Sequence, residues 1–223
     1  MTAAGVHSTP RETAPAAAAY PPVIGALRLA WLHAVSRRIP VALGLIAALG
    51  VLLWIALDYH WNIAGGRPAQ MLIPLTIEAG AAAVIAVATY GPFGEPERAT
   101  GRGLPYLRLA AALALTGAAY GALAAGATGG VLPSGFLVMF RNVAGITGVG
   151  LLAAAVLGGM LAWAGPMAYL VLTETMLSGG RSSAWVWPTK PPHDLGAALC
   201  AAGVFAAGAL LITLRGARES VRD

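Results

Sequence analysis

Long apolar stretches separated by short polar segments follow one another from residue 39 to residue 214. A length of roughly 20 apolar residues is what an α-helix needs to cross the hydrocarbon core of a bilayer. The pattern therefore predicts an all-α, polytopic membrane protein with about six transmembrane helices. The expected spans are residues 39–57, 71–90, 107–127, 142–157, 161–177 and 195–214.

The fourth and fifth spans come from one uninterrupted apolar run. No charged residue occurs from Val143 to Thr173, which is too long for one ordinary span and short for two. Gly158 and Gly159 near the middle of the run offer a tight turn. With two spans, ten of the 14 basic residues lie on the inner side of the membrane, whereas one span divides them equally. The positive-inside rule favours two spans, with both chain termini in the cytoplasm.

The segments outside the spans are polar or amphipathic. Residues 1–21 contain no apolar stretch of the kind found in a secretory signal and are predicted to form a disordered cytoplasmic tail. Residues 22–38 place apolar side chains on one side of a helical wheel and Arg28 and Arg37 on the other, which suits a helix lying in the membrane interface. The alternative is that they extend the first span. Residues 22–218 form the membrane domain, and residues 219–223 form a second cytoplasmic tail.

The composition supports a membrane protein and excludes several other classes. Apolar residues make up 58% of the chain and charged residues 10%, and the length leaves no room for a separate soluble catalytic domain. A net charge of +5 is compatible with nucleic-acid binding, but the arginines flank apolar runs, so membrane orientation explains them better and no nucleic-acid partner is expected. Cys200 is the single cysteine, and the four histidines are scattered, so neither a disulfide nor a metal site is expected.

The sequence also lacks familiar catalytic motifs. It has no Gly-x-x-x-x-Gly-Lys-Ser/Thr loop for nucleotide phosphates and no Gly-x-Ser-x-Gly turn for a serine nucleophile. An intramembrane enzyme needs a paired nucleophile and base on the spans, and no such pair is evident. We therefore expect no catalytic residues in this chain.

The polar loop of residues 91–106 is a candidate docking surface. It carries Phe93, Glu95, Glu97 and Arg98 between two apolar runs, and its glycines and prolines prevent one continuous helix. A short helix starting after Pro96 would have acidic residues in its first turn, where they complement the helix dipole. Such a helix would present these side chains to a partner on the cytoplasmic side. The alternative is an ordinary solvated turn.

Two carboxylates fall within predicted spans, where an ionised group is costly unless it is paired or hydrated. Glu78 and Glu174 lie in the outer half of the second and fifth spans, and Arg141 lies at the outer mouth of the fourth. One interpretation is a charged gate in which Arg141 faces Glu174, Glu78 or both. The other is that Glu174 and Arg141 extend to the interface. Glu78 lies deeper, which favours a paired or cavity role.

Two further features concern helix packing and membrane anchoring. Gly117-x-x-x-Gly121 is interpreted as a close helix contact within the chain rather than as a dimer signal. Trp185 and Trp187, in the outer loop of residues 178–194, are expected to dip into the outer membrane interface as anchors.

In its organisation over residues 22–218, the chain resembles the small six-span ABC-2 type permeases, which are membrane subunits of bacterial ABC transporters. The resemblance is carried by Arg-Asn-Val-Ala-Gly-Ile-Thr-Gly at 141–148, Leu-Ala-Trp-Ala-Gly-Pro-Met-Ala-Tyr at 161–169 and Trp-Val-Trp-Pro at 185–188. In that family an interfacial helix precedes the first span, the inner loop between spans 2 and 3 docks on the ATPase, and the outer loop between spans 5 and 6 partly re-enters the membrane. The matching stretches here are 22–38, 91–106 and 178–194.

The resemblance implies a location in the bacterial plasma membrane and a role in transport, mostly export. It also implies two kinds of partner. One is a separate ABC ATPase subunit, which would bind ATP and magnesium, since this chain carries neither site. The other is a second permease, identical or related. Two alternatives from the residues alone are an ion-driven secondary carrier using Glu78 and a non-transporting membrane assembly subunit.

Overall fold

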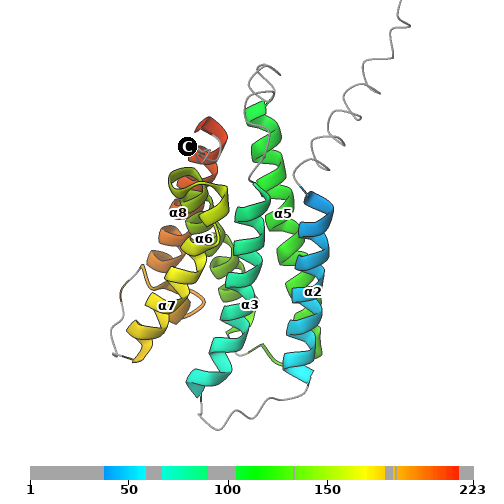
Figure 1. The fold of residues 1–223 in the computed structure, drawn as a ribbon. Coiled ribbons are helices and arrows are strands. Elements are labelled where there is room, and N and C mark those ends of the chain that lie inside the picture. Colours follow the sequence, from blue (N-terminus) through cyan, green and yellow to red (C-terminus); the bar gives the residue numbers. More distant parts are fainter. Residues whose placement is uncertain are drawn as a thin grey trace, which may run out of the picture.

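The computed structural model describes residues 38–58, 67–89, 104–132, 134–178, 183 and 185–215. Within them every regular element is helical, so the predicted all-α class is confirmed (Figure 1). The α-helices are α2 (Ile39–Asp58), α3 (Arg67–Ala88), α5 (Leu104–Gly126), α6 (Gly135–Leu157), α7 (Ala164–Ser178) and α8 (Leu195–Arg215). The described residues also contain the short 3-10 helices η2 (Ala127–Gly129), η3 (Gly159–Leu161) and η4 (Trp187–Thr189).

Among the described helices, four are long and apolar enough to cross a membrane, namely α2, α5, α6 and α8. Only the Leu72–Ala88 part of α3 is comparably apolar, and α7 has 15 residues, which gives it a length of about 22 Å. Large apolar side chains on the long helices point outward, including Val41, Leu199 and Leu214. Outward apolar side chains on helices of this length are typical of a protein surrounded by lipid.

The apolar run of residues 143–173 does turn at its glycine pair. α6 ends at Leu157, and Gly158 follows with φ at 91°, a left-handed conformation that glycine adopts at little cost. η3 then begins at Gly159 and leads into α7. The two glycines therefore convert one apolar run into two helices of opposite direction.

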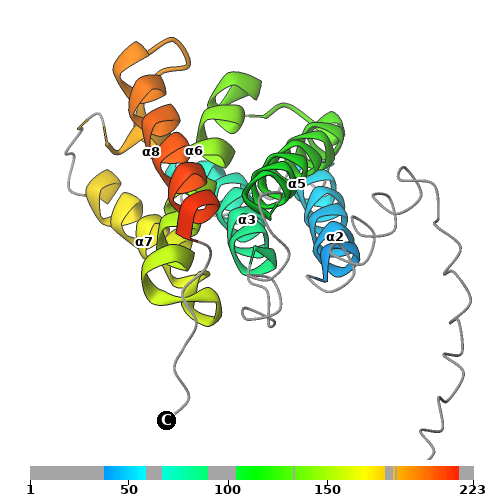
Figure 2. The ribbon, with the colours of Figure 1, turned by 90° about the horizontal axis from the view of Figure 1, so that it is seen from above.

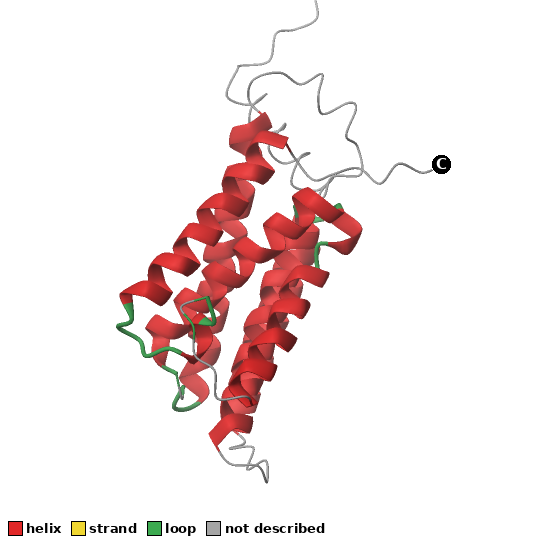
Figure 3. Cartoon of the chain, turned by 90° about the vertical axis from the view of Figure 1, so that its left-hand side faces the viewer, coloured by secondary structure: helices red, strands yellow, loops and turns green. Residues whose placement is uncertain are grey.

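The six described α-helices alternate in direction along the bundle. The starts of α2, α5 and α7 lie at one end, together with the ends of α3, α6 and α8 (Figure 1). Figure 2 shows α3 and α6 between a pair formed by α2 and α5 and a pair formed by α7 and α8, and Figure 3 gives the side view. α6 is the most buried of the four long helices and packs most extensively on α8 and α3. It is therefore the central helix of the bundle.

Small residues allow two pairs of helices to approach closely. A Cβ added to Gly148 of α6 would lie 2.5 Å from the backbone nitrogen of Phe205 in α8, and one added to Gly50 of α2 would lie 2.5 Å from the Ala122 carbonyl oxygen in α5. By contrast, nothing lies within 4 Å of a Cβ added at Gly117 or Gly121. The interpretation of Gly117 and Gly121 as a packing contact within the chain was therefore wrong. Their face of α5 is turned away from the neighbouring helices.

Several predicted features lie outside the described residues. These are the two tails, most of the interfacial helix predicted at residues 22–38, and the part of the docking loop up to residue 103.

Candidate functional site

A buried polar contact links α3 to α6 near the middle of the bundle. The Asn142 side-chain nitrogen Nδ2 donates a hydrogen bond of 2.9 Å to Oε2 of Glu78. Both side chains are buried, with exposed fractions of 1% for Glu78 and 3% for Asn142. A charged or amide side chain in such surroundings is costly to keep unless it is hydrogen-bonded, so this contact offsets part of the burial cost of both groups.

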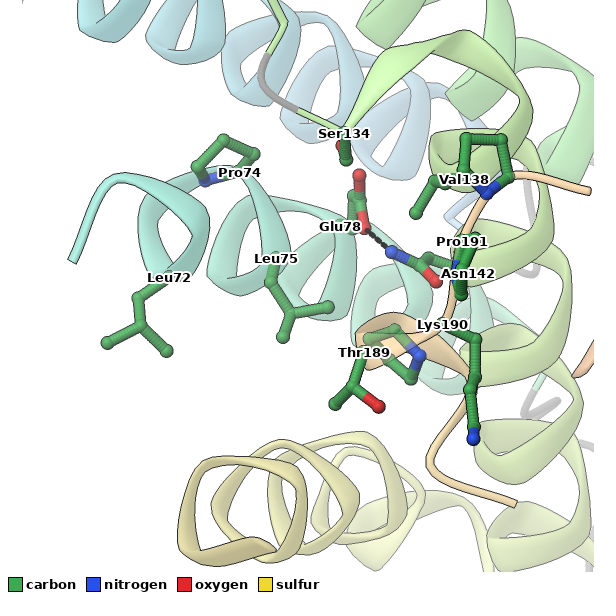
Figure 4. A pocket seen from close by; sticks show the side chains of 12 residues that line it. Leu72, Pro74, Leu75, Glu78, Ser134, Val138, Asn142, Thr189, Lys190 and Pro191 are labelled. Atoms are coloured by element: carbon green, nitrogen blue, oxygen red, sulfur yellow. Dashed lines mark hydrogen bonds between the residues drawn. The ribbon is translucent and has the colours of Figure 1, made fainter. Parts of the chain in front are cut away.

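Glu78 and Asn142 line a partly open cavity of about 340 Å³ (Figure 4). α3 supplies one wall with Leu72, Pro74 and Leu75, and α6 supplies another with Val138. The segment of residues 188–192, which contains three prolines, closes a third side. Most of the lining is therefore apolar, with a few polar groups at one place, which is the usual make-up of a small-molecule site.

The segment of residues 187–194, which begins with η4, is held to α6 by one arginine. The Arg141 guanidinium donates hydrogen bonds to the carbonyl oxygens of Trp187 at 2.6 Å, Lys190 at 2.7 Å and Pro191 at 2.8 Å. The carboxylate of Asp194 also interacts electrostatically with Arg141, and it caps α8 by accepting a 2.8 Å bond from the Ala197 backbone N–H. Arginine suits this position because its rigid, planar group presents five donors at once.

Arg141 lies inside a helix and not at its mouth, which corrects the predicted start of the fourth span. The sequence interpretation treated the arginine as a boundary and began the span at Asn142, whereas α6 begins at Gly135. Arg141 is only 6% exposed. A charged group can occupy the second turn of this helix because carbonyl oxygens from a distant segment of the chain receive its hydrogen bonds.

Trp187 lies inside the bundle, so its predicted role as an interface anchor was wrong. It is 2% exposed and stacks on Tyr169 with ring centroids 4.5 Å apart. A Cβ added at Gly145 of α6 would lie 2.6 Å from the Trp187 ring, so the missing side chain at Gly145 makes room for the indole. Trp185 is 39% exposed, and its carbonyl oxygen accepts a 2.9 Å hydrogen bond from the Tyr169 hydroxyl.

The three residues predicted as a charged gate therefore have separate positions. Glu78 bonds to Asn142, while Arg141 bonds to carbonyl groups of residues 187–191. Glu174 is half-buried near the end of α7, one turn before Ser178. Glu78 therefore bonds to the residue that follows Arg141 in α6 and not to Arg141 itself.

The predicted docking residues Phe93, Glu95, Glu97 and Arg98 lie outside the described residues. The helices at either side of them are described, and both α3 and α5 meet the connection at the same end of the bundle (Figure 1).

Sequence reasoning did not single out Asn142, Tyr169 or Asp194. One signal was present for Asn142, because it is a polar residue directly after Arg141 at the start of an otherwise apolar run. No comparable signal marks Tyr169 or Asp194 in the sequence, since their roles depend on residues from other elements.

Comparisons of the chain with protein-family models, with curated proteins and with solved structures found no match. Among the described residues, no group of three or more histidine, cysteine, aspartate or glutamate side chains is placed to hold a metal ion. The site is a small, mainly apolar cavity with the polar pair Glu78 and Asn142 at one place in its lining, which suits binding of a small ligand.

Proposed function

We propose that this chain is the membrane-spanning permease subunit of an ATP-driven ABC transporter of the ABC-2 type, working as an exporter. In this proposal all six helices cross the bacterial plasma membrane, including the shorter α3 and α7, and both termini are cytoplasmic. A separate ATPase subunit docks on residues 91–106, and a second permease, identical or related, completes the path.

The observation that carries the proposal is that α3 and its connection to α5 meet at the end of the bundle where α2 begins and α8 finishes (Figure 1). We therefore expect the docking loop and both terminal segments to lie on the same side of the membrane. Three arginines mark the same end, because Arg38 precedes α2, Arg108 lies in the first turns of α5 and Arg215 ends α8. A cluster of arginines at one end of a helical bundle favours the cytoplasmic side for that end.

The cavity beside Glu78 supports a transport role. Ionisable residues within membrane helices are rare and commonly mark the path of a substrate or an ion. In this proposal, ATP binding draws the two ATPase subunits together, they push on residues 91–106, and the connected α3 and α5 shift. Glu78 lies on α3, so such a shift would change the walls of the cavity.

A second candidate function is an ion-driven secondary carrier, and the buried Glu78 is the observation that favours it. Such a carrier would transport without ATP and would depend on a proton or sodium gradient. A non-transporting assembly subunit is a third possibility, and it would show no substrate-dependent flux with every partner present.

Purification of the tagged chain in a mild detergent separates these functions. The permease proposal predicts that an ATP-hydrolysing protein copurifies in stoichiometric amount, and that replacing Glu95 and Glu97 together by alanine uncouples ATP hydrolysis from transport. Arg215→Ala, at the same end but outside the loop, serves as the matched control and should leave coupling unchanged. Coupled transport that survives the double substitution would count against docking through this loop, and gradient-driven flux without ATP would favour the carrier.

A further inference from the structure

We propose that the cavity between α3, α6 and residues 188–192 binds a primary ammonium group attached to an apolar body, with Glu78 and Asn142 accepting its hydrogen bonds. The inference deepens the proposed transport function and rests on it for passage of the ligand across the membrane. Binding itself requires only this chain.

Glu78 and Asn142, the polar pair at the cavity, offer hydrogen-bond acceptors to a ligand. Because Nδ2 of Asn142 donates to Glu78, the amide oxygen Oδ1 points another way, and it is buried without a hydrogen-bond partner. Figure 4 shows Glu78 and Asn142 side by side at the cavity. A carboxylate and an amide oxygen at one place favour a ligand that brings several N–H donors and a positive charge, and an ammonium group supplies both.

Among the described side chains that line the cavity, neither Lys190 nor Ser134 forms a hydrogen bond with Glu78 or Asn142. Lys190 lines the cavity, but Figure 4 shows its side chain directed away from Glu78. Ser134, which also lines the cavity, stands at the N-cap of α6 without capping the helix through its side chain. Its hydroxyl group is therefore not committed to the helix end.

The walls of the cavity determine the size and polarity of the rest of the ligand. Leu75, Val138 and the prolines of residues 188–192 present apolar surface on the sides of the cavity. A volume of about 340 Å³ is at the small end of the range for ligand sites, roughly 300–1,000 Å³. The cavity therefore suits a compact amphipathic amine better than a hydrophilic solute or a large drug.

An ammonium group of this kind has two sources, a soluble amine and the ethanolamine headgroup of a phospholipid. The cavity extends from Ser134, just before the start of α6, inward to Glu78 in the middle turns of α3. Lipid headgroups lie at the ends of a membrane-spanning bundle, so a headgroup amine would enter the cavity from that end. The two sources share the same chemistry at Glu78 and are separated by the experiment.

The test uses the purified full-length chain in detergent, with any partner that accompanies it. Isothermal titration with 2-phenylethylamine, protonated at pH 7, should give saturable binding, whereas 2-phenylethanol and 3-phenylpropionate should bind at least ~10-fold more weakly. Glu78→Gln and Asn142→Ala should each weaken binding of the amine at least ~10-fold. Arg215→Met, which removes an exposed charge at the end of α8 and outside the cavity, is the control and should retain binding.

A second arm identifies the source. If phosphatidylethanolamine displaces the amine and phosphatidylcholine does not, the site takes the lipid headgroup; if neither displaces it, the site takes the soluble amine. Equal binding of the amine and the alcohol overturns the proposal, as does absence of amine binding together with absence of selectivity for phosphatidylethanolamine. The comparison of ligands on the unaltered protein stands even if a variant fails to fold. Amine binding without any copurifying ATPase would refute the transporter assignment and leave the site intact.

Discussion

Replacing Arg141 by methionine should release the segment of residues 187–194 while the helices stay in place. Methionine fills much of the same volume and brings no charge of its own, although the half-buried Asp194 loses its electrostatic interaction with the guanidinium. What it removes is the set of three hydrogen bonds to the carbonyl oxygens of Trp187, Lys190 and Pro191. The segment then keeps the Trp187 side chain and the Tyr169 contact as its principal attachments.

The size of the effect follows from those bonds. A hydrogen bond to a charged group contributes about 1.5–3 kcal/mol, but the three bonds share one guanidinium and do not add. The Trp187 carbonyl belongs to a buried residue, whereas Pro191 is exposed. Water can therefore replace the arginine as the hydrogen-bond donor to the Pro191 carbonyl. We therefore expect a loss of about 2–4 kcal/mol in the free energy that keeps the segment closed.

Amide hydrogen exchange in detergent measures this local opening. The Lys190 amide donates to the Trp187 carbonyl at 3.1 Å, and the Asp194 amide donates to the Pro191 carbonyl at 3.2 Å, so both share an acceptor with Arg141. At about 1.4 kcal/mol per factor of ten, their exchange should accelerate by roughly 30- to 1,000-fold. Arg141→Lys, which keeps the charge but not the fork of donors, should fall between methionine and the unaltered protein.

Arg215→Met is the matched control, because Arg215 is an exposed arginine at the end of α8. It should leave exchange in residues 187–194 unchanged. The reasoning would be refuted if Arg141→Met left these two amides as protected as before. It would equally fail if exchange increased by the same factor throughout α6 and α8, since that would make Arg141 a support of the whole bundle.

Two further predictions concern packing, and thermal unfolding in detergent measures both. Gly148→Ala should lower the free energy of unfolding by about 1–3 kcal/mol, because the new Cβ meets the backbone of α8 at 2.5 Å. Gly117→Ala, with open space around it, should be neutral or slightly stabilising. If both substitutions lowered the free energy of unfolding equally, the close contact of α6 with α8 at Gly148 would be contradicted. Trp187→Ala should cost about 3–5 kcal/mol because the ring is buried. Trp185→Ala, at a half-exposed ring, should cost clearly less, and the reverse order would restore the anchor role to Trp187.

The sequence by itself determined the helical class and the approximate position of each helix. The reason is that a bilayer accepts a lone segment only if its backbone hydrogen bonds are satisfied within it, so a long apolar run is almost always a helix. A glycine pair likewise acts locally: Gly158 can adopt a positive φ, so the turn after Leu157 could be predicted from the sequence. Hydroxyl groups also follow local rules: the Thr173 hydroxyl donates to the Tyr169 carbonyl four residues earlier in its own helix, at 2.9 Å.

Only the tertiary structure decided what the polar side chains in these helices do. In the sequence, a lone arginine beside an apolar run indicates the end of a span. Arg141 instead lies inside a helix, because residues 187–191 bring three carbonyl groups that accept its hydrogen bonds. Trp187 reads as a membrane anchor until Gly145 is seen to leave space for its ring. The partner of Glu78 depends on how α3 and α6 rotate and align against one another, and their sequences carry no direct record of that alignment. Contacts between distant helices are set by packing of the whole bundle, which is why Asn142 emerged only with the fold.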